Sequence, residues 1–388
     1  MSLDFDSARL PNPHFTEEHH AWREALRRFI DTEVMPYADD WDEAGAIPTE
    51  LWPKAAEVGL LGLGYPEQFG GTPTDSWHSW IVNEELSRVG AGGISASLMV
   101  HGIGLPPVLN WGPEWMQAEV APQVLKGEKW ISLGITEPGG GSDVANLTTT
   151  AVRDGDHYVV SGSKTYITGG MRANWVSTAV RTGGSGAGGV SMLLIPTDAE
   201  GFSRTPLDRK MGWWASDTAT LYFDEVRVPV DNLIGTENEG FKVIMTNFNS
   251  ERMGMAAAME AYARVCLEEA VAWATERKTF GKRLADHQVI RHKIAQMKQQ
   301  LNATQAYIRF CYESIEAGTP NPGDIALLKV QASEVMEFCA REAMQILGGI
   351  GYMRGSRIER IYREVRVNAI GGGSEEIMRD LAARQLGL

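Results

Sequence analysis

The chain has 388 residues, of which 43% are hydrophobic, and it carries a formal net charge of −14 at pH 7. This length suits a globular protein of two or three domains. The negative charge argues against nucleic acid as a partner, because binding a phosphate backbone needs a basic surface. No apolar run of about 18 residues occurs, so we expect no transmembrane helix. The acidic N-terminus, MSLDFDSARLPNPHF, lacks the pattern of a signal peptide.

The three cysteines, Cys266, Cys311 and Cys339, all lie in apolar helical patterns. Their spacing matches neither a metal site nor a disulfide framework. We therefore predict reduced thiols in the core, no bound metal and a cytoplasmic protein.

Residues 1–129 are predicted to form an N-terminal helical domain. Trp22, Leu26 and Phe29 recur at helical spacing, and Pro36 then ends or bends that run. His101 lies in an apolar run further along. A lone histidine of this kind is more often a hydrogen-bonded core residue than a ligand.

The pattern changes between residues 130 and 236, where short alternating runs are separated by Gly, Asp and Pro turns. Such runs are typical of antiparallel strands in a small sandwich or barrel. Residues 237–388 then become helical again, beginning with a long helix predicted from Asn249 to Lys282. A later helix is predicted to start at Pro322 and Asp324 and to end at the Gly348-Gly349 pair. The predicted fold class is α+β and multidomain, with an all-α domain, a middle antiparallel β domain and a four-helix-bundle-like C-terminal domain.

One carboxylate on the long helix has a predicted direction. Glu260, Arg264 and Glu268 recur every four residues and form a narrow polar stripe on an otherwise apolar helix. At about 100° per residue, Glu251 lies roughly opposite this stripe and points into the protein. Two structural explanations compete with a functional one: the carboxylate could favour a helix N-terminus through the dipole, or it could form a salt bridge.

Two glycine-rich or aromatic motifs belong to the β region. In LGITEPGGGSD, from Leu133 to Asp143, three consecutive glycines allow close approach of a ligand to the backbone. An ordinary flexible loop is the alternative. In SKTYITGG, Tyr166 and Thr168 are two residues apart on a predicted strand and project from one face. They could form a platform for a flavin ring or simply a strand with a half-buried Tyr.

Two further motifs belong to the helical C-terminal region. ERKTFGKRLADHQ, from Glu276 to Gln288, is locally basic and breaks the long helix at Gly281. It suits a pyrophosphate or, alternatively, a solvated helix C-terminus. IGGGSEEIM places three glycines before a helix whose N-cap is predicted to be Ser374. Its backbone N–H groups could bind a carbonyl oxygen or an anion; an inter-helix loop is the alternative.

These motifs, in this order, resemble the acyl-CoA dehydrogenase family of flavoproteins over nearly the whole chain. The most specific parts are TEPGGGSD, KTYITGG, ERKTFGKRLADHQ, QILGGIGY and GGGSEEI. The resemblance implies the fold of that family and FAD bound between the β domain and the C-terminal helices. Tyr166 stands where the family more commonly has Trp.

The resemblance also implies the cofactor contacts. From the β domain they are Leu133, Ile135, Thr136, Gly141, Ser142, Tyr166, Ile167 and Thr168, with Thr168 next to the flavin N5 edge. The contacts made to a neighbouring subunit's FAD, within a tetramer built as a dimer of dimers, are Arg277, Phe280, Gln288, Gln345, Gly348 and Gly349. Ser374 and Glu376 complete the set of cofactor residues.

The sequence departs from the commonest family pattern at the catalytic base. Many members carry Glu-Gly-Thr before the last helix, whereas Gly372, Gly373 and Ser374 occupy these positions here. In the isovaleryl and long-chain types, which this chain resembles, the base lies on the long helix directly before an arginine. That position is Glu251, before Arg252. An apolar pocket beside the flavin would raise the pKa of such a carboxylate and strengthen it as a base.

The implied reaction is α,β-dehydrogenation of an acyl-CoA to a trans-2-enoyl-CoA, with electrons passed to an electron-transfer flavoprotein. Glu251 removes the α proton, flavin N5 accepts the β hydride, and the Gly372 N–H stabilises the enolate oxygen. Ser142, Asn249, Arg252 and Gly373 are the implied substrate contacts. Two alternatives are a flavin-dependent monooxygenase on the same fold and a non-catalytic relative that has lost the flavin.

Overall fold

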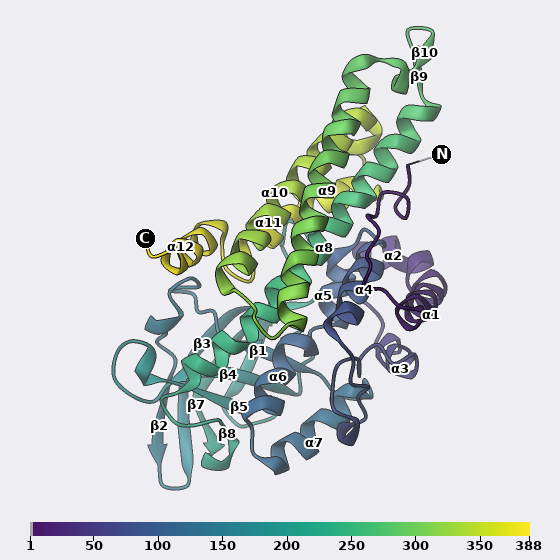
Figure 1. The fold of residues 1–388 in the computed structure, drawn as a ribbon. Helices are drawn as coiled ribbons and strands as arrows, with labels where there is room; N and C mark the ends of the chain where they lie inside the picture. Colours follow the sequence, from purple (N-terminus) through teal and green to yellow (C-terminus); the bar gives the residue numbers. More distant parts are fainter. Residues whose placement is uncertain (1–2) are drawn as a thin grey trace. The chain divides into compact units, whose positions relative to one another are not determined.

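The computed structural model of the protein describes residues 3–388 (Figure 1). Residues 1 and 2 of the N-terminal segment lie outside the described part. Two compact units divide the chain, and each combines segments that are distant in sequence. The helical unit contains residues up to 40, 74–92 and 252–388, and the sheet unit contains residues 41–73 and 93–251.

Long helices make up most of the helical unit. Two helices from the N-terminal part of the chain and five from the C-terminal part contribute, and α8 belongs to this unit from Arg252 onward. Their bounds are α1 Glu17–Glu33, α4 Ser76–Ser87, α8 Gly240–Glu276, α9 Gln288–Glu316, α10 Pro322–Leu347, α11 Arg357–Ile370 and α12 Glu375–Gln385. Shorter pieces are η1 Met35–Tyr37, β9 Lys278–Thr279, β10 Lys282–Arg283, η6 Leu284–Asp286 and η7 Gly348–Tyr352.

Helix ends in this unit follow the capping residues of the sequence. Asn321 caps α10 by accepting hydrogen bonds from the backbone N–H groups of Gly323 and Asp324. Pro322 occupies the first helical position, and Gly348, with φ of 64°, ends the helix. Ser374 caps α12 by accepting a hydrogen bond from the N–H of Ile377. These predicted boundaries are confirmed.

The core of the helical unit lies around α8. Its buried Ala and Met side chains pack with residues of α4, α9, α10 and α11 in one continuous cluster. Cys266, Cys311 and Cys339 are all buried there as free thiols, as predicted. Small and flexible apolar side chains at this position allow the surrounding helices to approach α8 closely.

The sheet unit combines a sheet with short helices. The helices are α3 Leu51–Glu57, α6 His101–Trp111 and α7 Glu114–Leu125, while α2 Ala38–Ala44 and α5 Gly92–Leu98 begin at the boundary between the units. The strands are β1 Ile131–Gly134, β2 Thr150–Asp154, β3 His157–Thr168, β4 Trp175–Arg181, β5 Val190–Pro196, β6 Phe202–Pro206, β7 Thr218–Pro229 and β8 Leu233–Ile234. Four short 3-10 turns are η2 Glu67–Phe69, η3 Val144–Asn146, η4 Ala187–Gly189 and η5 Val230–Asn232.

The strands follow the order β6-β7-β3-β2-β4-β5-β8, and β1 pairs with β4. Strands β4 and β5 are buried along nearly their whole length. Trp175 and Ala179 of β4 pack with residues of α6 and α7, whereas Val176 and Val180 pack in a second cluster formed by the sheet itself. Because side chains along β4 alternate between the two faces of the sheet, this strand contributes to two separate apolar cores.

The fold class predicted from the sequence is confirmed, with corrections of detail. The sheet is not purely antiparallel, because β1 runs parallel to β4. The stretch from Ser79 to Gly112, whose pattern predicts two helices, holds three: most of α4, then α5 and α6. The long helix starts at Gly240 and ends at Glu276, so the prediction of Asn249 to Lys282 was wrong at both ends.

His101 is a satisfied core residue, as favoured from the sequence. Its side chain is buried, and its Nε2 pairs with the Leu61 carbonyl oxygen at 3.0 Å. Burial lowers the pKa of His101 to about 4, so its imidazole stays neutral at neutral pH.

Among the described residues, one segment, Gly92–Trp111, has the length and mean hydropathy of a membrane span. A turn at Met99 and Val100 separates its two helices, α5 and α6. Most of its residues are buried inside the structure. A buried core helix passes the same test, so the segment is weak evidence for a membrane span.

Candidate active site

The glycine-rich motif of the sheet unit follows β1 and is open to solvent. Gly139 to Ser142 are exposed, and a side chain built at Gly139 or Gly140 would meet no atom within 4 Å. Glu137 and Gly140 pair with each other through both backbone N–H groups, at 3.1 Å each. The Glu137–Gly140 pair therefore fixes the start of the loop, while the backbone of its glycines stays accessible, as a ligand-binding loop requires.

A buried ion pair anchors this loop to β3. The Lys164 ammonium donates to Glu137 Oε1 at 2.8 Å and to the Ile135 carbonyl at 3.1 Å. Glu137 also accepts hydrogen bonds from Thr148 and from the backbone N–H of Thr149. Both charged side chains are almost fully buried. The two sequence motifs that the resemblance assigns to FAD are thus joined by one pair of charges.

Tyr166 has a conformation that sequence periodicity did not predict. The pairing of β3 with β7 shifts register between Lys164 and Ile167, and Tyr166 has φ of 59°. A left-handed backbone is unfavourable for an aromatic residue and is typical of sites where geometry is imposed by function. The Tyr166 side chain is 70% exposed. Thr168 is half-buried beyond the intervening, buried Ile167. The regular strand on which Tyr166 and Thr168 were predicted to project from one face is therefore interrupted at Tyr166.

Two of the predicted cofactor residues cannot offer their side chains. Ile135 and Ile167 are buried in the two apolar clusters of the sheet unit. Any contact that they make with a cofactor would come from the backbone. Leu133 and Thr136 are half-buried, while Gly141 and Ser142 are exposed.

Two positively charged side chains hold the glycine turn, Gly371 to Gly373, that precedes α12 in the helical unit. Lys329 is fully buried on α10 and donates to the carbonyl oxygens of Ala369 at 2.9 Å and Gly373 at 2.8 Å. Arg252 Nε donates to the Gly372 carbonyl oxygen at 3.0 Å. Gly372 and Gly373 have φ of 66° and 106°, values that exclude most side chains. The peptide groups of this turn are therefore fixed from two sides.

Glu251 and Gly372, the predicted catalytic pair, fall in different compact units, and α8 passes from one unit to the other between Glu251 and Arg252. Glu251 is half-buried, and its Oε2 atom is shielded from solvent. Because α8 starts at Gly240, Glu251 lies about three turns inside the helix, which removes the helix-dipole explanation. Asn249, one predicted substrate contact, is also half-buried on α8.

The polar stripe predicted on the long helix, opposite which Glu251 was placed, does not face solvent. Glu260 and Arg264 were expected to form a polar stripe on a wet surface, but both are fully buried. Arg264 pairs with Glu260 at 3.0 Å and with Glu84 of α4 at 2.5 Å. Burial raises the pKa of the Glu260 carboxyl to about 7. The spacing of polar residues marked a buried ion network rather than a solvent-facing side.

The basic motif after α8 forms a protruding hairpin. Strands β9 and β10 pair antiparallel, and the two residues between them, Phe280 and Gly281, both have positive φ. This is the backbone of a two-residue hairpin turn. Phe280 is 98% exposed, and Arg277 and Gln288 beside the hairpin are also exposed. The helix ends at Glu276, not at Gly281 as predicted.

The remaining predicted residues lie at helix ends. Gln345, Gly348 and Gly349 are exposed at the C-terminal end of α10. Ser374 is the N-cap of α12, and Glu376 is exposed in its first turn. Helix ends present unpaired backbone groups, which suits contacts with a polar ligand.

Sequence reasoning missed several residues that hold the two motifs. Lys329 and Lys164 were not singled out, although a lysine within an apolar helical or strand pattern signals a buried cation. No sequence pattern marked Ser132 and Asp217 either, although both bind the segment that contains Thr168. Only three-dimensional pairing identifies them.

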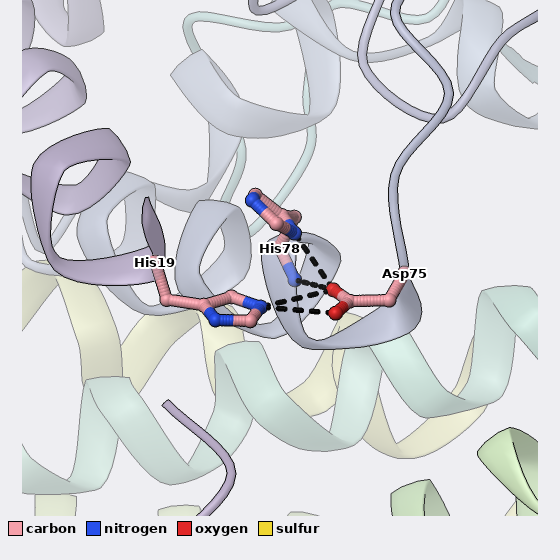
Figure 2. A group of neighbouring side chains, drawn as sticks. All are labelled: His19, Asp75 and His78. Atoms are coloured by element: carbon pink, nitrogen blue, oxygen red, sulfur yellow. Dashed lines mark hydrogen bonds and ion pairs between the residues drawn. The ribbon is translucent and has the colours of Figure 1, made fainter. Parts of the chain in front are cut away.

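The described residues contain one group of side chains that could hold a metal ion by distance: His19, Asp75 and His78 of the helical unit (Figure 2). His19 Nε2 lies 3.0 Å and His78 Nδ1 2.7 Å from Asp75 Oδ1. His19 Nδ1 accepts a hydrogen bond from the Thr16 backbone N–H at 3.0 Å. A neutral imidazole that accepts at Nδ1 carries its proton at Nε2, the atom that faces Asp75. The hydrogen bonds therefore favour a structural role for His19, Asp75 and His78. The three side chains would link the starts of α1 and α4, and we call this link the clasp.

Family models and relatives agree with this architecture. Models of the N-terminal, middle and C-terminal domains of acyl-CoA dehydrogenase match residues 16–128, 132–226 and 238–387. The chain is 37% identical to "Acyl-CoA dehydrogenase AFT10-1" of Alternaria alternata over 97% of its own length and 93% of that protein. It matches the crystal structure of a probable acyl-CoA dehydrogenase from Mycobacterium abscessus with a TM-score of 0.94 and 46% identity, covering 96% of this chain and 99% of that one. The chain belongs to the acyl-CoA dehydrogenase family, and it is an oxidoreductase of this class.

Two further solved structures are similar. One, at 26% identity and a TM-score of 0.90, is a glutaryl-CoA dehydrogenase from Mycobacterium smegmatis in complex with FADH2; the match covers 96% of this chain and 95% of that one. The other, at 30% identity and a TM-score of 0.92, is described as an electron transferring flavoprotein of Acidaminococcus fermentans; the match covers 97% of this chain and 99% of that one. The family is FAD-dependent.

The residues of the sheet unit fit FAD. The backbone at Gly139 and Gly140 is open, the Tyr166 side chain is exposed and Thr168 is half-buried, so an aromatic ring, a hydroxyl-bearing residue and free backbone are available on these two segments. An isoalloxazine has the matching chemistry, a flat aromatic system with a polar edge.

Proposed function

We propose that this protein oxidises an acyl-CoA thioester to a trans-2-enoyl-CoA, with Glu251 as the base. The Glu251 carboxylate takes the proton from C2, and a hydride leaves C3 as the C2–C3 double bond forms. Bound FAD supplies the two-electron acceptor for that hydride. One observation carries the assignment of the base. Gly372 has no side chain, so it offers no carboxylate, and its carbonyl oxygen is bound by Arg252. Glu251, in contrast, has a carboxylate with one oxygen shielded from water.

The turn of Gly372 is proposed to stabilise the negative charge that develops on the thioester oxygen. Lys329 and Arg252 fix two carbonyl groups of the turn, and Lys329 also binds the Ala369 carbonyl at the end of α11, so the N–H groups of the turn need no reorganisation during the reaction. Preorganised donors of this kind are typically worth about 10²–10³ in rate each. Arg252 is buried and bound to the turn. We therefore assign it first to holding the turn and second to the predicted contact with CoA.

Substrate contacts are proposed for Ser142 and Asn249 with the CoA portion, and for Gly373 near the acyl group. The missing side chain at Gly372 leaves volume that would admit a branched or bulky acyl chain. A panel of straight and branched acyl-CoAs with an artificial electron acceptor decides this point. Equal or better turnover of straight chains would contradict a preference for branched ones.

Two partners are proposed. An electron-transfer flavoprotein would take the electrons, as the resemblance to the family implies. A second copy of this chain would receive the exposed Phe280 hairpin, with Arg277, Gln288, Gln345, Gly348 and Gly349, against its FAD within a tetramer. The exposure of Phe280 in a left-handed conformation supports this assignment. A cytoplasmic location is proposed from the three reduced, buried cysteines.

Glu251→Gln tests the proposed base. The variant keeps the size of the side chain but cannot accept a proton. We expect it to bind FAD and acyl-CoA, and to lose bleaching of the flavin by acyl-CoA. The control is Glu239→Gln, which changes another carboxylate near Glu251 in the sequence, and the flavin of this variant should bleach normally. Full bleaching by Glu251→Gln would show that the base lies elsewhere.

A further inference from the structure

The segment that follows Tyr166 and Thr168 is held by residues outside every motif of the sequence. Ser132 of β1 is fully buried, and its hydroxyl donates to the Thr168 carbonyl oxygen at 2.9 Å. Gly169 follows with φ of 70°, and a side chain built there would lie 3.1 Å from Ser132 Oγ. The close approach of β1 to Thr168 therefore depends on glycine at this position.

Asp217 holds the same segment from the other side. Its carbonyl oxygen accepts from the Gly169 N–H at 2.9 Å, and its carboxylate accepts from the Met171 N–H at 2.9 Å and from Arg172 Nε at 2.7 Å. Arg204 adds hydrogen bonds to the carbonyl oxygens of Gly170 and Ala173, at 3.0 Å each. The turn after Thr168 is therefore held at several points of its backbone.

The loop that carries Asp217 is itself braced. The Lys210 ammonium donates to the Trp213 carbonyl at 2.8 Å, to the Thr218 hydroxyl at 2.9 Å and to the Ser216 carbonyl. Trp214 Nε1 donates to the Lys210 carbonyl at 2.9 Å. Asp217 is thus presented from a rigid loop, and Thr218 beside it pairs in register with Thr168 across β7 and β3.

We infer that Ser132 and Asp217 are positioning residues that set the place of Thr168 against the flavin. This inference rests on the proposed function, in which Thr168 touches the reactive edge of FAD. Neither residue needs to touch the cofactor. Their role is to remove freedom from the Thr168 backbone, because a displacement of about 1 Å at a reacting centre can cost about 10²-fold in rate.

Four single variants test the inference: Ser132→Ala, Asp217→Asn, Thr168→Ala and the control Asp154→Asn. Asp154 also pairs with an arginine of the sheet, Arg227 at 2.8 Å, but both side chains are exposed. For Ser132→Ala and Asp217→Asn we expect a shifted visible spectrum and reduction potential of bound FAD. We also expect flavin reduction at saturating acyl-CoA to slow by about 10- to 100-fold with little change in KM. In the apoprotein, hydrogen exchange at Met171, whose N–H is bound by the Asp217 carboxylate, should accelerate in Asp217→Asn, whereas Gly169, bound by the Asp217 backbone carbonyl, should change less. The control should match wild type throughout.

The outcomes separate this inference from the proposed function. If Thr168→Ala leaves the flavin spectrum and reduction rate unchanged, the proposed role of Thr168 fails. If Thr168→Ala changes both while Ser132→Ala and Asp217→Asn lower only the melting temperature, the positioning role is overturned and the proposed function stands. Ser132→Ala removes a single hydroxyl and decides the question should Asp217→Asn fail to fold. In the double variant Thr168→Ala/Asp217→Asn, the effect on the reduction rate should be no larger than that of Thr168→Ala alone.

Discussion

Lys164 Nζ lies 2.8 Å from Glu137 Oε1 inside the sheet unit, where the lysine is fully buried and the glutamate nearly so. Beside this pair, the Thr165 N–H donates to the Thr136 carbonyl at 2.9 Å. The glycine-rich loop and the strand with Tyr166 are 27 residues apart at this ion pair and are fixed together by it. Two binding segments from different elements thus share one rigid support, as a preorganised site needs.

Breaking one side of this pair should be costly. Lys164→Met leaves the Glu137 carboxylate buried without its cation, and we expect a loss of about 3–5 kcal/mol in the free energy of unfolding. The double variant Lys164→Met/Glu137→Met removes both charges and should be more stable than Lys164→Met alone. Urea denaturation of the apoprotein measures both values. Equal stability of the single and double variants would show that the charges do not interact.

The same pair predicts a dependence on acid. Burial acts to raise the pKa of Glu137, but the Lys164 charge and hydrogen bonds from Lys164, Thr148 and Thr149 outweigh it and lower this pKa to about 2. The unfolded chain therefore binds more protons than the folded chain between about pH 4.5 and 2. The stabilisation is complete above pH 4.5 and is lost as the pH falls through this window. Glu137→Gln should flatten that part of the stability curve, and an unchanged slope would contradict the assignment.

A third prediction concerns Lys329, which binds both ends of the Gly372 turn. Lys329→Met should slow flavin reduction at saturating acyl-CoA by about tenfold or more, because the turn loses part of its preorganisation. KM should change little, since Lys329 lies on α10 beneath the turn and not among the proposed CoA contacts. Rapid-mixing absorbance at the flavin band is the measurement. Arg379→Met, which breaks an exposed pair with Glu334 of α10, is the matched control.

Order and type of the main elements follow from local patterns in the sequence. The caps of α10 and α12 are read from Asn321, Pro322 and Ser374, because a cap depends on neighbours in sequence. The start of α8 was missed by nine residues, from Asn249 back to Gly240. The segment between them mixes aromatic, β-branched and polar residues, so no regular apolar period marks it as helical.

The site was less predictable, because its geometry depends on distant contacts. Alternation predicted that Tyr166 and Thr168 share a face, but the register shift and the positive φ of Tyr166 come from pairing with β7 and from the Lys164 anchor. Glu260 and Arg264 read as a surface stripe because Glu84, the second partner of Arg264, is 180 residues away in the sequence. Spacing on one helix reports which residues share a side, and it cannot report what covers that side.

The exposed hairpin gives a fourth prediction. Phe280 occupies a left-handed position that glycine adopts without steric cost. Phe280→Gly should therefore leave the melting temperature of the apoprotein nearly unchanged, while weakening FAD binding and the association of subunits. Fluorescence titration with FAD and analytical ultracentrifugation measure these effects. Val152→Ala, at an apolar residue of β2 that is 64% exposed, should change neither. Unaltered FAD affinity and assembly in Phe280→Gly would remove the proposed contact with a second copy.

The fifth prediction decides the role of the cluster of His19, Asp75 and His78. Asp75 is the N-cap of α4, and its carboxylate accepts from the His78 N–H at 3.3 Å as well as from both imidazoles. Asp75→Ala should therefore cost about 0.5–2 kcal/mol through the lost cap alone, and more through the lost clasp. Asp75→Asn keeps the cap but cannot accept from both rings as well, so its stability should lie between that of Asp75→Ala and wild type.

Zinc should not bind this cluster tightly, because a metal at His19 Nε2 must displace the proton that the Thr16 contact places there. We expect zinc titration of the purified protein, followed by calorimetry and by melting temperature, to show no stoichiometric event that depends on these residues. His78→Gln is the matched variant, since it removes one candidate ligand and keeps a polar side chain. One equivalent of zinc bound by wild type and lost in His78→Gln would show instead that the Thr16 hydrogen bond gives way and that the clasp is a metal site.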